Sequence, residues 1–351
     1  MQVVSGALAN GAGEAQQQQD GGHGTDSHSR TATSTTTSST AATSSSDLAQ
    51  VLQALQAIYA PASTNDTRRQ ATEFLEQAKR HPDAPLHGHT LARDGAQPTA
   101  LRYYGLTLLE HTIRYRWDEL TPDQTAVLRD YIVELAQATT AGDAVYLRNK
   151  VAQLWSEIAK RSWAADEWAA MDEQLVALWA ESPHHQAVVL CVLETLCDDV
   201  FNRDDAAAGL RGSDLGRACV DIFTPLAVLQ EILPARDKSL AVRCGSEGWL
   251  SRLCANLAEC LRHDYHEQDA VRVSAIKTMH ALRAAMPWTM PKAIAATRVV
   301  EAVCKALAVP VVEMQLVGRG PATLSLCLHR RPLTGHRPLS RSCRPSTAGT
   351  T

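Results

Sequence analysis

Apolar residues recur every three to four positions through the middle of the chain, which is the period of an amphipathic α-helix. Between residues 145 and 163, one face of such a helix would carry Leu147, Val151, Leu154 and Ile158, and the opposite face carries charged and amide side chains. The segments before and after it follow the same period, and no strand-like alternation separates them. The pattern therefore predicts successive antiparallel helices joined by short turns.

Helix start and stop signals support this prediction. Thr121 followed by Pro122 and Gln124 is the pattern of an amino-terminal cap, a first-turn proline and a capping-box residue. Gly142 is suited to the left-handed conformation that ends a helix, and Asp143 is then expected to cap the next one.

The helices group into pairs with a period of roughly forty residues, which is typical of HEAT-type repeats. We expect an all-α fold, specifically a right-handed α-solenoid of HEAT-type antiparallel helical hairpins, because each pair buries its apolar face only by stacking on the next. The expected pairs cover residues 47–80, 99–140, 143–180, 184–233 and 239–286. Within them we expect single helices over 213–233, capped by Ser213 and kinked at Pro225, and over 240–262, with a further helix at 292–308.

The interval 81–97 contains two prolines and two glycines and is interpreted as a loop. Its histidines His81, His87 and His89 suggest a metal site, but no cysteine or well-placed acid completes a tetrahedral set of ligands. A solvated loop is the favoured interpretation.

Composition divides the chain into three parts. Residues 1–46 are rich in Gln, Ser and Thr and are expected to form a disordered low-complexity tail, whereas 47–309 is the expected repeat array. Residues 310–351 are expected to be an irregular basic tail, possibly a gene-model artefact, because they lack helical periodicity. The formal net charge of -4 comprises -2 over residues 1–46, -8 over 47–313 and +6 over 314–351.

Enzyme and membrane functions find no support in the residues. The sequence has no phosphate-binding glycine loop, no G-x-S-x-G and no H-E-x-x-H motif, so we expect no catalytic residue, no metal and no cofactor. No apolar run reaches membrane-spanning length, and we expect no signal peptide. The nine cysteines lack C-x-x-C spacing and indicate buried, reduced packing residues of a nuclear or cytosolic protein.

Two motifs carry a family resemblance. The run Leu101-Arg102-Tyr103-Tyr104-Gly105 leading to Trp117, and Arg148-Asn149-Lys150-Val151-Ala152 leading to Lys160-Arg161-Ser162-Trp163, resemble the amino-terminal region of karyopherin-beta nuclear transport receptors, in particular the exportins. The family usually has proline where this chain has Ala164 and Ala169, and a full receptor is about three times longer.

The resemblance implies a non-enzymatic receptor that binds the GTPase Ran in its GTP form and shuttles between nucleus and cytoplasm. Implied cargoes are RNA, either tRNA or short-hairpin RNA, and phosphorylated proteins; nuclear pore proteins are implied transient partners. Cargo and Ran-GTP would each favour the receptor form that binds the other. The candidate Ran-binding residues are acids on what we expect to be second helices of the pairs: Asp130, Glu134, Asp172 and Glu173.

Two alternatives remain open. The chain could be a generic helical-repeat interaction scaffold without Ran dependence, because stacked hairpins serve many proteins. It could also be a non-functional fragment, which would expose an apolar face around Ile294, Val299 and Val303.

Overall fold

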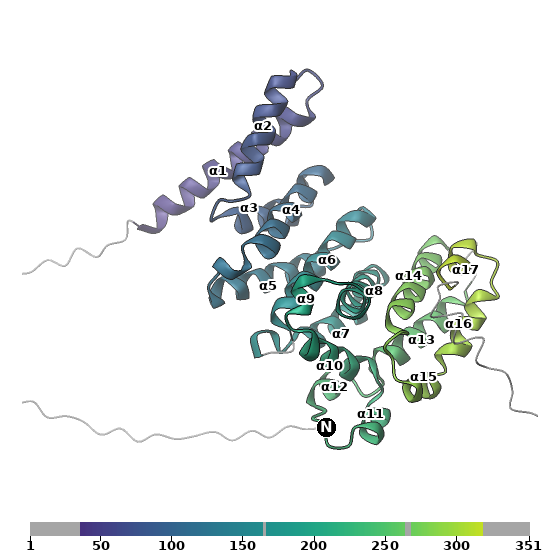
Figure 1. Ribbon diagram of the computed structural model, residues 1–351. Coiled ribbons are helices and arrows are strands. Elements are labelled where there is room, and N and C mark those ends of the chain that lie inside the picture. The colour runs from purple at the N-terminus through teal and green to yellow at the C-terminus, as the bar shows by residue number, and fades with distance from the viewer. Residues whose placement is uncertain (1–35, 164–165, 264–267, 319–351) are drawn as a thin grey trace, which may run out of the picture. The chain divides into compact units, whose positions relative to one another are not determined.

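The computed structural model describes residues 36–163, 166–263 and 268–318, and these ranges contain helices and connecting turns but no strand (Figure 1). The chain divides into two units, residues 1–45 and residues 46–351. The all-α prediction is therefore confirmed for the described residues.

The first half of the described chain contains eight α-helices, which Figure 1 labels in order. They are α1 (Thr36–Tyr59), α2 (Asn65–Ala78), α3 (Ala84–Arg93), α4 (Thr99–Tyr115), α5 (Pro122–Gln137), α6 (Val145–Ser162), α7 (Met171–Glu181) and α8 (Pro183–Cys197). Short 3-10 turns follow α4 and α6, and a π-helical turn, η3 (Asp198–Asn202), follows α8.

Nine further α-helices, most of them shorter, make up the second half of the described chain. They are α9 (Ala206–Gly209), α10 (Gly212–Phe223), α11 (Leu226–Ile232), α12 (Ser239–Cys244), α13 (Gly248–Cys260), α14 (Asp269–Ala285), α15 (Pro291–Thr297), α16 (Val299–Leu307) and α17 (Val312–Gly318). None of the described helices is both long and apolar enough to cross a membrane.

The predicted cap of α5 is confirmed. The Thr121 hydroxyl accepts a hydrogen bond from the Gln124 backbone N–H at 3.3 Å, and the Gln124 side chain accepts one from the Thr121 N–H at 2.9 Å. This reciprocal pair satisfies two amide donors that have no partner within the helix.

The prediction for the turn between α5 and α6 is wrong. Gly142 does not adopt a positive φ, and α6 begins after Ala144 without a side-chain cap. Asp143 instead accepts a hydrogen bond from the Thr140 N–H at 2.7 Å and forms an ion pair with Arg102 of α4. The arginine on a neighbouring helix thus holds the carboxylate that the sequence suggested as a cap.

The largest correction concerns residues 81–97, which are not a loop. Most of this interval forms α3, with Pro85 in its first turn, and both His87 and His89 are buried. Gly88 lies against Gly105 of α4, where an added Cβ atom would come within 2.7 Å of a backbone oxygen. A proline, a glycine and two histidines made the segment resemble a loop, although the small glycine serves close helix packing.

The missed helix changes how the helices pair. The structure packs α3 on α4, α5 on α6 and α7 on α8, and α4, α6, α8 and α14 contact one another in turn. The predicted pairs 99–140 and 143–180 joined α4 with α5 and α6 with α7, so the prediction was out of step by one helix.

Three predicted long helices are interrupted. Pro225 separates α10 from α11 instead of kinking one helix, because proline disfavours helical geometry at the preceding residue. Gly245 and Gly248, both with positive φ, separate α12 from α13. Arg298, with a φ of 55°, separates α15 from α16. Ser213 lies within the first turn of α10 and does not cap it.

Helical structure extends beyond both expected boundaries of the array. The first helix begins at Thr36, eleven residues before residue 47, where the repeat array was expected to begin. At the other end, α17 packs on α14 and buries Met314 and Val317. The remainder of the expected basic tail, residues 319–351, lies outside the described residues.

The core is continuous from α3 to α17 and contains three fully buried tryptophans, Trp155, Trp163 and Trp249. Val299 and Val303 are buried in it, so the expectation that they form an exposed apolar face is wrong. Five of the seven described cysteines are buried, as predicted for packing residues, whereas Cys191 is half-buried and Cys304 is exposed.

Candidate partner-binding surface

The two predicted acids on α5 are accessible. Asp130 is exposed, and Glu134 is half-exposed at the junction with α3. One Glu134 oxygen lies 3.0 Å from Arg93 Nη1 and 3.2 Å from His89 Nε2. His89 also stacks on Tyr131 with 4.0 Å between ring centroids, and burial lowers the pKa of this histidine. Glu134 therefore links α5 to α3 while one side remains open to a partner.

The two predicted acids on α7 differ sharply. Asp172 is 0% exposed, and burial raises the pKa of its carboxyl group despite Arg243 of α12, which lies 3.5 Å away. Glu173 is exposed and lies 3.8 Å from the same guanidinium. Asp172 therefore contacts the interior and joins α7 to α12, and only Glu173 of this pair is accessible to a partner.

These acids also lie on different members of the helix pairs than the sequence suggested. With α3 in place, α5 and α7 are the first helices of their pairs, not the second. The two helices contact each other, so Asp130, Glu134 and Glu173 belong to neighbouring elements.

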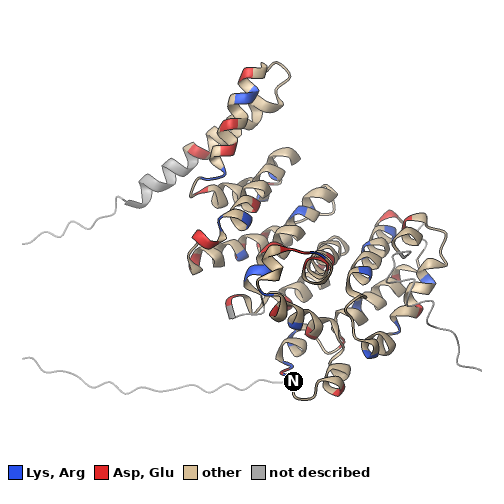
Figure 2. Ribbon diagram, in the orientation of Figure 1, with Lys and Arg blue, Asp and Glu red and all other residues tan. Residues whose placement is uncertain are grey.

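Charged residues are dispersed along the helices (Figure 2). Several of them form ion pairs between helices that the sequence did not reveal. Between α4 and α6, Glu110 pairs with Lys150 at 2.6 Å and Arg114 pairs with Glu157 at 2.6 Å. The partners in each of these ion pairs lie forty or more residues apart in the sequence. The three- and four-residue spacing within a single helix therefore cannot predict them.

Lys160 of α6 is the centre of a buried charge network. Its ammonium group is fully buried and lies 3.1 Å from Glu157, 2.8 Å from Asp199 and 2.9 Å from Asp205. Burial alone would raise the pKa of Glu157, but the charges of Lys160 and Arg114 and hydrogen bonds hold it below its ordinary value. The three carboxylates are close enough to bind a metal ion, and the ammonium group already supplies the cation there.

An apolar groove of about 230 Å³ lies between the start of α3 and α5. Its exposed apolar side chains are Leu86 and Val127, each more than 40% exposed. Its other apolar lining residues are Pro82, Pro85, Leu120, Leu128 and Tyr131. Exposed apolar side chains around a groove are typical of surfaces that bind other proteins.

Comparison with known proteins places this region in context. Residues 71–138, from within α2 to the end of α5, match the family described as importin-beta N-terminal domain. The chain is 27% identical over 259 residues to Protein MSN5 of Saccharomyces cerevisiae, covering 70% of this chain and 21% of that protein.

Further relatives cover shorter stretches. Protein HASTY 1 of Arabidopsis thaliana is 29% identical over 190 residues, 53% of this chain and 15% of the relative. Exportin-5 of Mus musculus is 25% identical over 155 residues, 43% of this chain and 13% of the relative. The chain thus spans about a fifth or less of the length of these relatives.

Proposed function

Since this chain belongs to the karyopherin-beta family of nuclear transport receptors, we propose that its amino-terminal helices bind Ran in the GTP form and that it serves export of RNA or protein cargo from nucleus to cytoplasm. The match of residues 71–138 to the importin-beta N-terminal domain carries the proposal. Receptors of this family are not enzymes, which confirms the prediction that the chain has no catalytic activity.

The arrangement of helices supports a right-handed α-solenoid of HEAT-type hairpins as the architecture. The pairs α3–α4, α5–α6 and α7–α8 follow one another, and their second helices contact in sequence. Repeats of this kind present long surfaces to large partners. We place the array from α1 to α17, between the low-complexity amino-terminal segment and the basic carboxy-terminal segment.

The mechanism is thermodynamic linkage. Ran-GTP and cargo each stabilise the receptor conformation to which the other binds, so GTP hydrolysis in the cytoplasm releases both. The receptor shuttles between the two compartments, and the energy for directional transport comes from the nucleotide state of Ran.

The accessible acids Asp130, Glu134 and Glu173 are the proposed contacts for basic residues of Ran. A single exposed ion pair contributes roughly 0–1 kcal/mol. We therefore propose that the three acids attract Ran together, through their combined negative electrostatic potential. Asp172 contributes indirectly, by holding Arg243 and the start of α7 in position.

The groove formed by Leu86, Val127 and their neighbours is the proposed site for nuclear pore proteins. An apolar side chain of a passing pore protein would be buried there, and the small contact area suits rapid association and release.

Calorimetric titration of the full chain with Ran-GTP and Ran-GDP at physiological salt tests the function. We expect at least tenfold tighter binding of Ran-GTP. Equal affinity for the two forms, or no binding by a folded helical protein, would contradict the proposal and favour a Ran-independent scaffold.

A double charge reversal, Asp130→Lys with Glu173→Lys, tests the contacts. We expect Ran-GTP to bind at least fivefold more weakly. Asp269→Lys with Glu313→Lys is the control matched in charge, because both acids are exposed in the first turns of other helices, α14 and α17. Equal losses in the two proteins would show that only net charge matters.

A further inference from the structure

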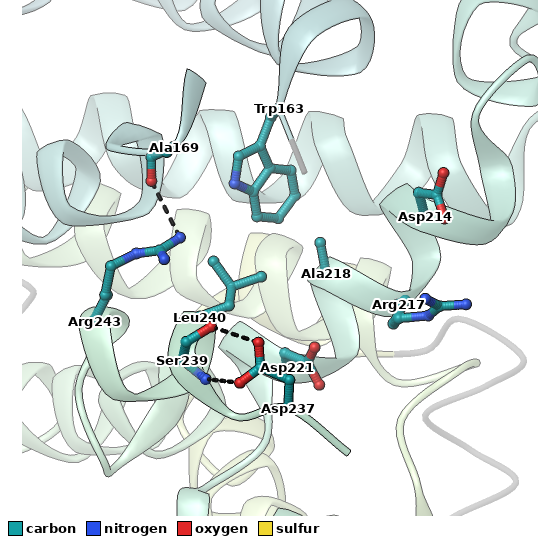
Figure 3. A pocket seen from close by; sticks show the side chains of 10 residues that line it. All are labelled: Trp163, Ala169, Asp214, Arg217, Ala218, Asp221, Asp237, Ser239, Leu240 and Arg243. Carbon is teal, nitrogen blue, oxygen red and sulfur yellow. Dashed lines mark hydrogen bonds between the residues drawn. The ribbon is translucent and has the colours of Figure 1, made fainter. Parts of the chain in front are cut away.

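A polar cavity of about 310 Å³ lies between α10, α12 and the residues Trp163 and Ala169, which flank the 3-10 turn η2 (Asp166–Trp168) (Figure 3). Trp163, which follows α6, extends into this space from one side. Three aspartates line the cavity: Asp214 and Asp221 on α10, and Asp237 two residues before α12. None of these residues belongs to the proposed Ran surface on α5 and α7.

Two buried polar groups in the lining lack a hydrogen-bond partner among the described residues. Trp163 is 1% exposed, and its indole N–H has no acceptor. Asp221 is 5% exposed, and its Oδ1 atom forms no aligned hydrogen bond although Arg236 Nε lies 3.1 Å away. A buried donor or acceptor without a partner costs about 1–3 kcal/mol, so such groups mark a position that a ligand can satisfy.

The arginines around the cavity are largely occupied by the protein itself. Arg243 donates to the Ala169 carbonyl at 3.2 Å (Figure 3). It also pairs with Asp172 and Glu173 of α7. Arg236 donates to the Arg217 carbonyl at 2.9 Å and faces Asp221.

The cavity lining holds three aspartates and two arginines, Arg217 and Arg243, and Arg243 is shared with Asp172 and Glu173, so acids outnumber cations. Asp237 accepts hydrogen bonds from the Ser239 N–H at 3.0 Å and hydroxyl at 2.9 Å, but a carboxylate can accept more than two. Asp214 is exposed at the rim and Arg217 is the remaining cation of the lining. This charge balance favours a positively charged occupant.

We propose that the cavity binds one arginine side chain presented by a partner polypeptide. The guanidinium group donates to the carboxylates of Asp214 and Asp221, and its planar face stacks on the Trp163 ring. The aliphatic stem packs against Leu240 and Ala218, and the indole N–H donates to a main-chain carbonyl of the same peptide. The carboxylates that would hold the guanidinium group are not among the proposed Ran contacts, so this proposal stands or fails separately from the proposed transport function.

The test uses the full chain with ¹⁵N-labelled tryptophan and the peptide acetyl-Ala-Ala-Arg-Ala-Ala-amide. The indole N–H resonance of Trp163 is assigned by its loss in Trp163→Phe. We expect this resonance to shift and saturate with the arginine peptide, and to stay unchanged with the same peptide carrying glutamine. No shift at millimolar peptide, or equal shifts with glutamine or glutamate peptides, would overturn the proposal.

Two variants locate the binding. Asp214→Asn and Asp221→Asn should each weaken arginine-peptide binding at least threefold, whereas the control Asp123→Asn, on α5, should leave it unchanged. Asp214 is exposed, so its variant tests the site even if Asp221→Asn fails to fold. Unchanged affinity in a folded Asp214→Asn protein would exclude this acid from the site. Ran-GTP binding should be the same in wild type and Asp214→Asn.

Discussion

Two facing glycines set how closely α3 and α4 approach. A Cβ atom on Gly88 would lie 2.7 Å from the Gly105 carbonyl oxygen, and one on Gly105 would lie 2.6 Å from that of Gly88. Both contacts are to backbone, which cannot rotate away as a flexible side chain can. The close packing of α3 on α4 therefore requires glycine at both positions, because a larger side chain at either one would collide with the facing backbone.

Gly88→Ala should therefore lower the free energy of unfolding by about 1–3 kcal/mol, the usual cost of overpacking. Urea denaturation followed by circular dichroism measures the change. Gly95→Ala is the control, since no atom lies within 4 Å of its added Cβ, and a change within about 0.5 kcal/mol is expected. Equal effects at the two glycines would argue against close packing of α3 on α4.

The buried ammonium group of Lys160 forms ion pairs with three carboxylates. Lys160→Met should destabilise the protein by about 3–5 kcal/mol, because it removes the buried cation that Glu157, Asp199 and the half-buried Asp205 share. Lys305→Met, at a side chain that is 68% exposed, should change stability by no more than about 0.5 kcal/mol. A loss below about 1 kcal/mol at Lys160 would mean that water reaches these acids.

Asp221 should give stability a specific pH dependence. Burial raises its pKa to about 6, from an ordinary value of 3.8 that applies to the unfolded chain. Between these values the folded state retains a proton that the unfolded state has lost, so this group makes the free energy of unfolding fall as pH rises. The contribution is fully present below about pH 4 and lost above about pH 6.

Asp221→Asn removes that contribution. Melting temperatures measured from pH 4 to pH 7 should therefore fall less steeply in the variant than in wild type, which shares every other titrating group. Parallel curves for the two proteins would show that Asp221 titrates alike in the folded and unfolded states.

At the residue scale, sequence reasoning worked where partners are close along the chain. The Thr121 cap was predictable because its partner is three residues away. Asp172 and Glu173 are adjacent in sequence, and which of them is buried depends on Arg243 in α12, about seventy residues later. Helical spacing carries no information about such a distant contact.

At the scale of elements, most helices in the first half were predictable, since their apolar faces span several turns. The short α3 was not, because its proline, glycine and histidines gave no clear amphipathic pattern. Because α3 was missed, the predicted helix pairs were shifted by one helix. The candidate acids were therefore assigned to the second helix of each pair, whereas they lie on the first. Arg298 could not be recognised as a break, because arginine rarely adopts a positive φ.

The capping box of α5 should contribute measurably to this element. Thr121→Ala should destabilise the protein by about 1 kcal/mol, since the Gln124 N–H loses its acceptor. Ser213→Ala, at a serine that the sequence suggested as a cap but that lies within α10, should cost less than about 0.5 kcal/mol. Chemical denaturation measures both, and equal losses would contradict the assigned cap.

At the scale of the whole molecule, the family resemblance covers about residues 47–205, and the matched domain covers residues 71–138. The polar cavity was not predictable, because its lining comes from Trp163, α10 and α12, which are separated by up to eighty residues. The chain covers about a fifth of its longer relatives, so the proposed Ran surface is the part of the transport mechanism most directly accessible to experiment.

Hydrogen–deuterium exchange of the full chain with Ran-GTP and with Ran-GDP tests the central claim most directly. The account predicts slower amide exchange within residues 71–138 on addition of Ran-GTP, and little change with Ran-GDP at the same concentration. Unchanged exchange in residues 71–138 with saturating Ran-GTP, or equal protection by the two nucleotide forms, would contradict it.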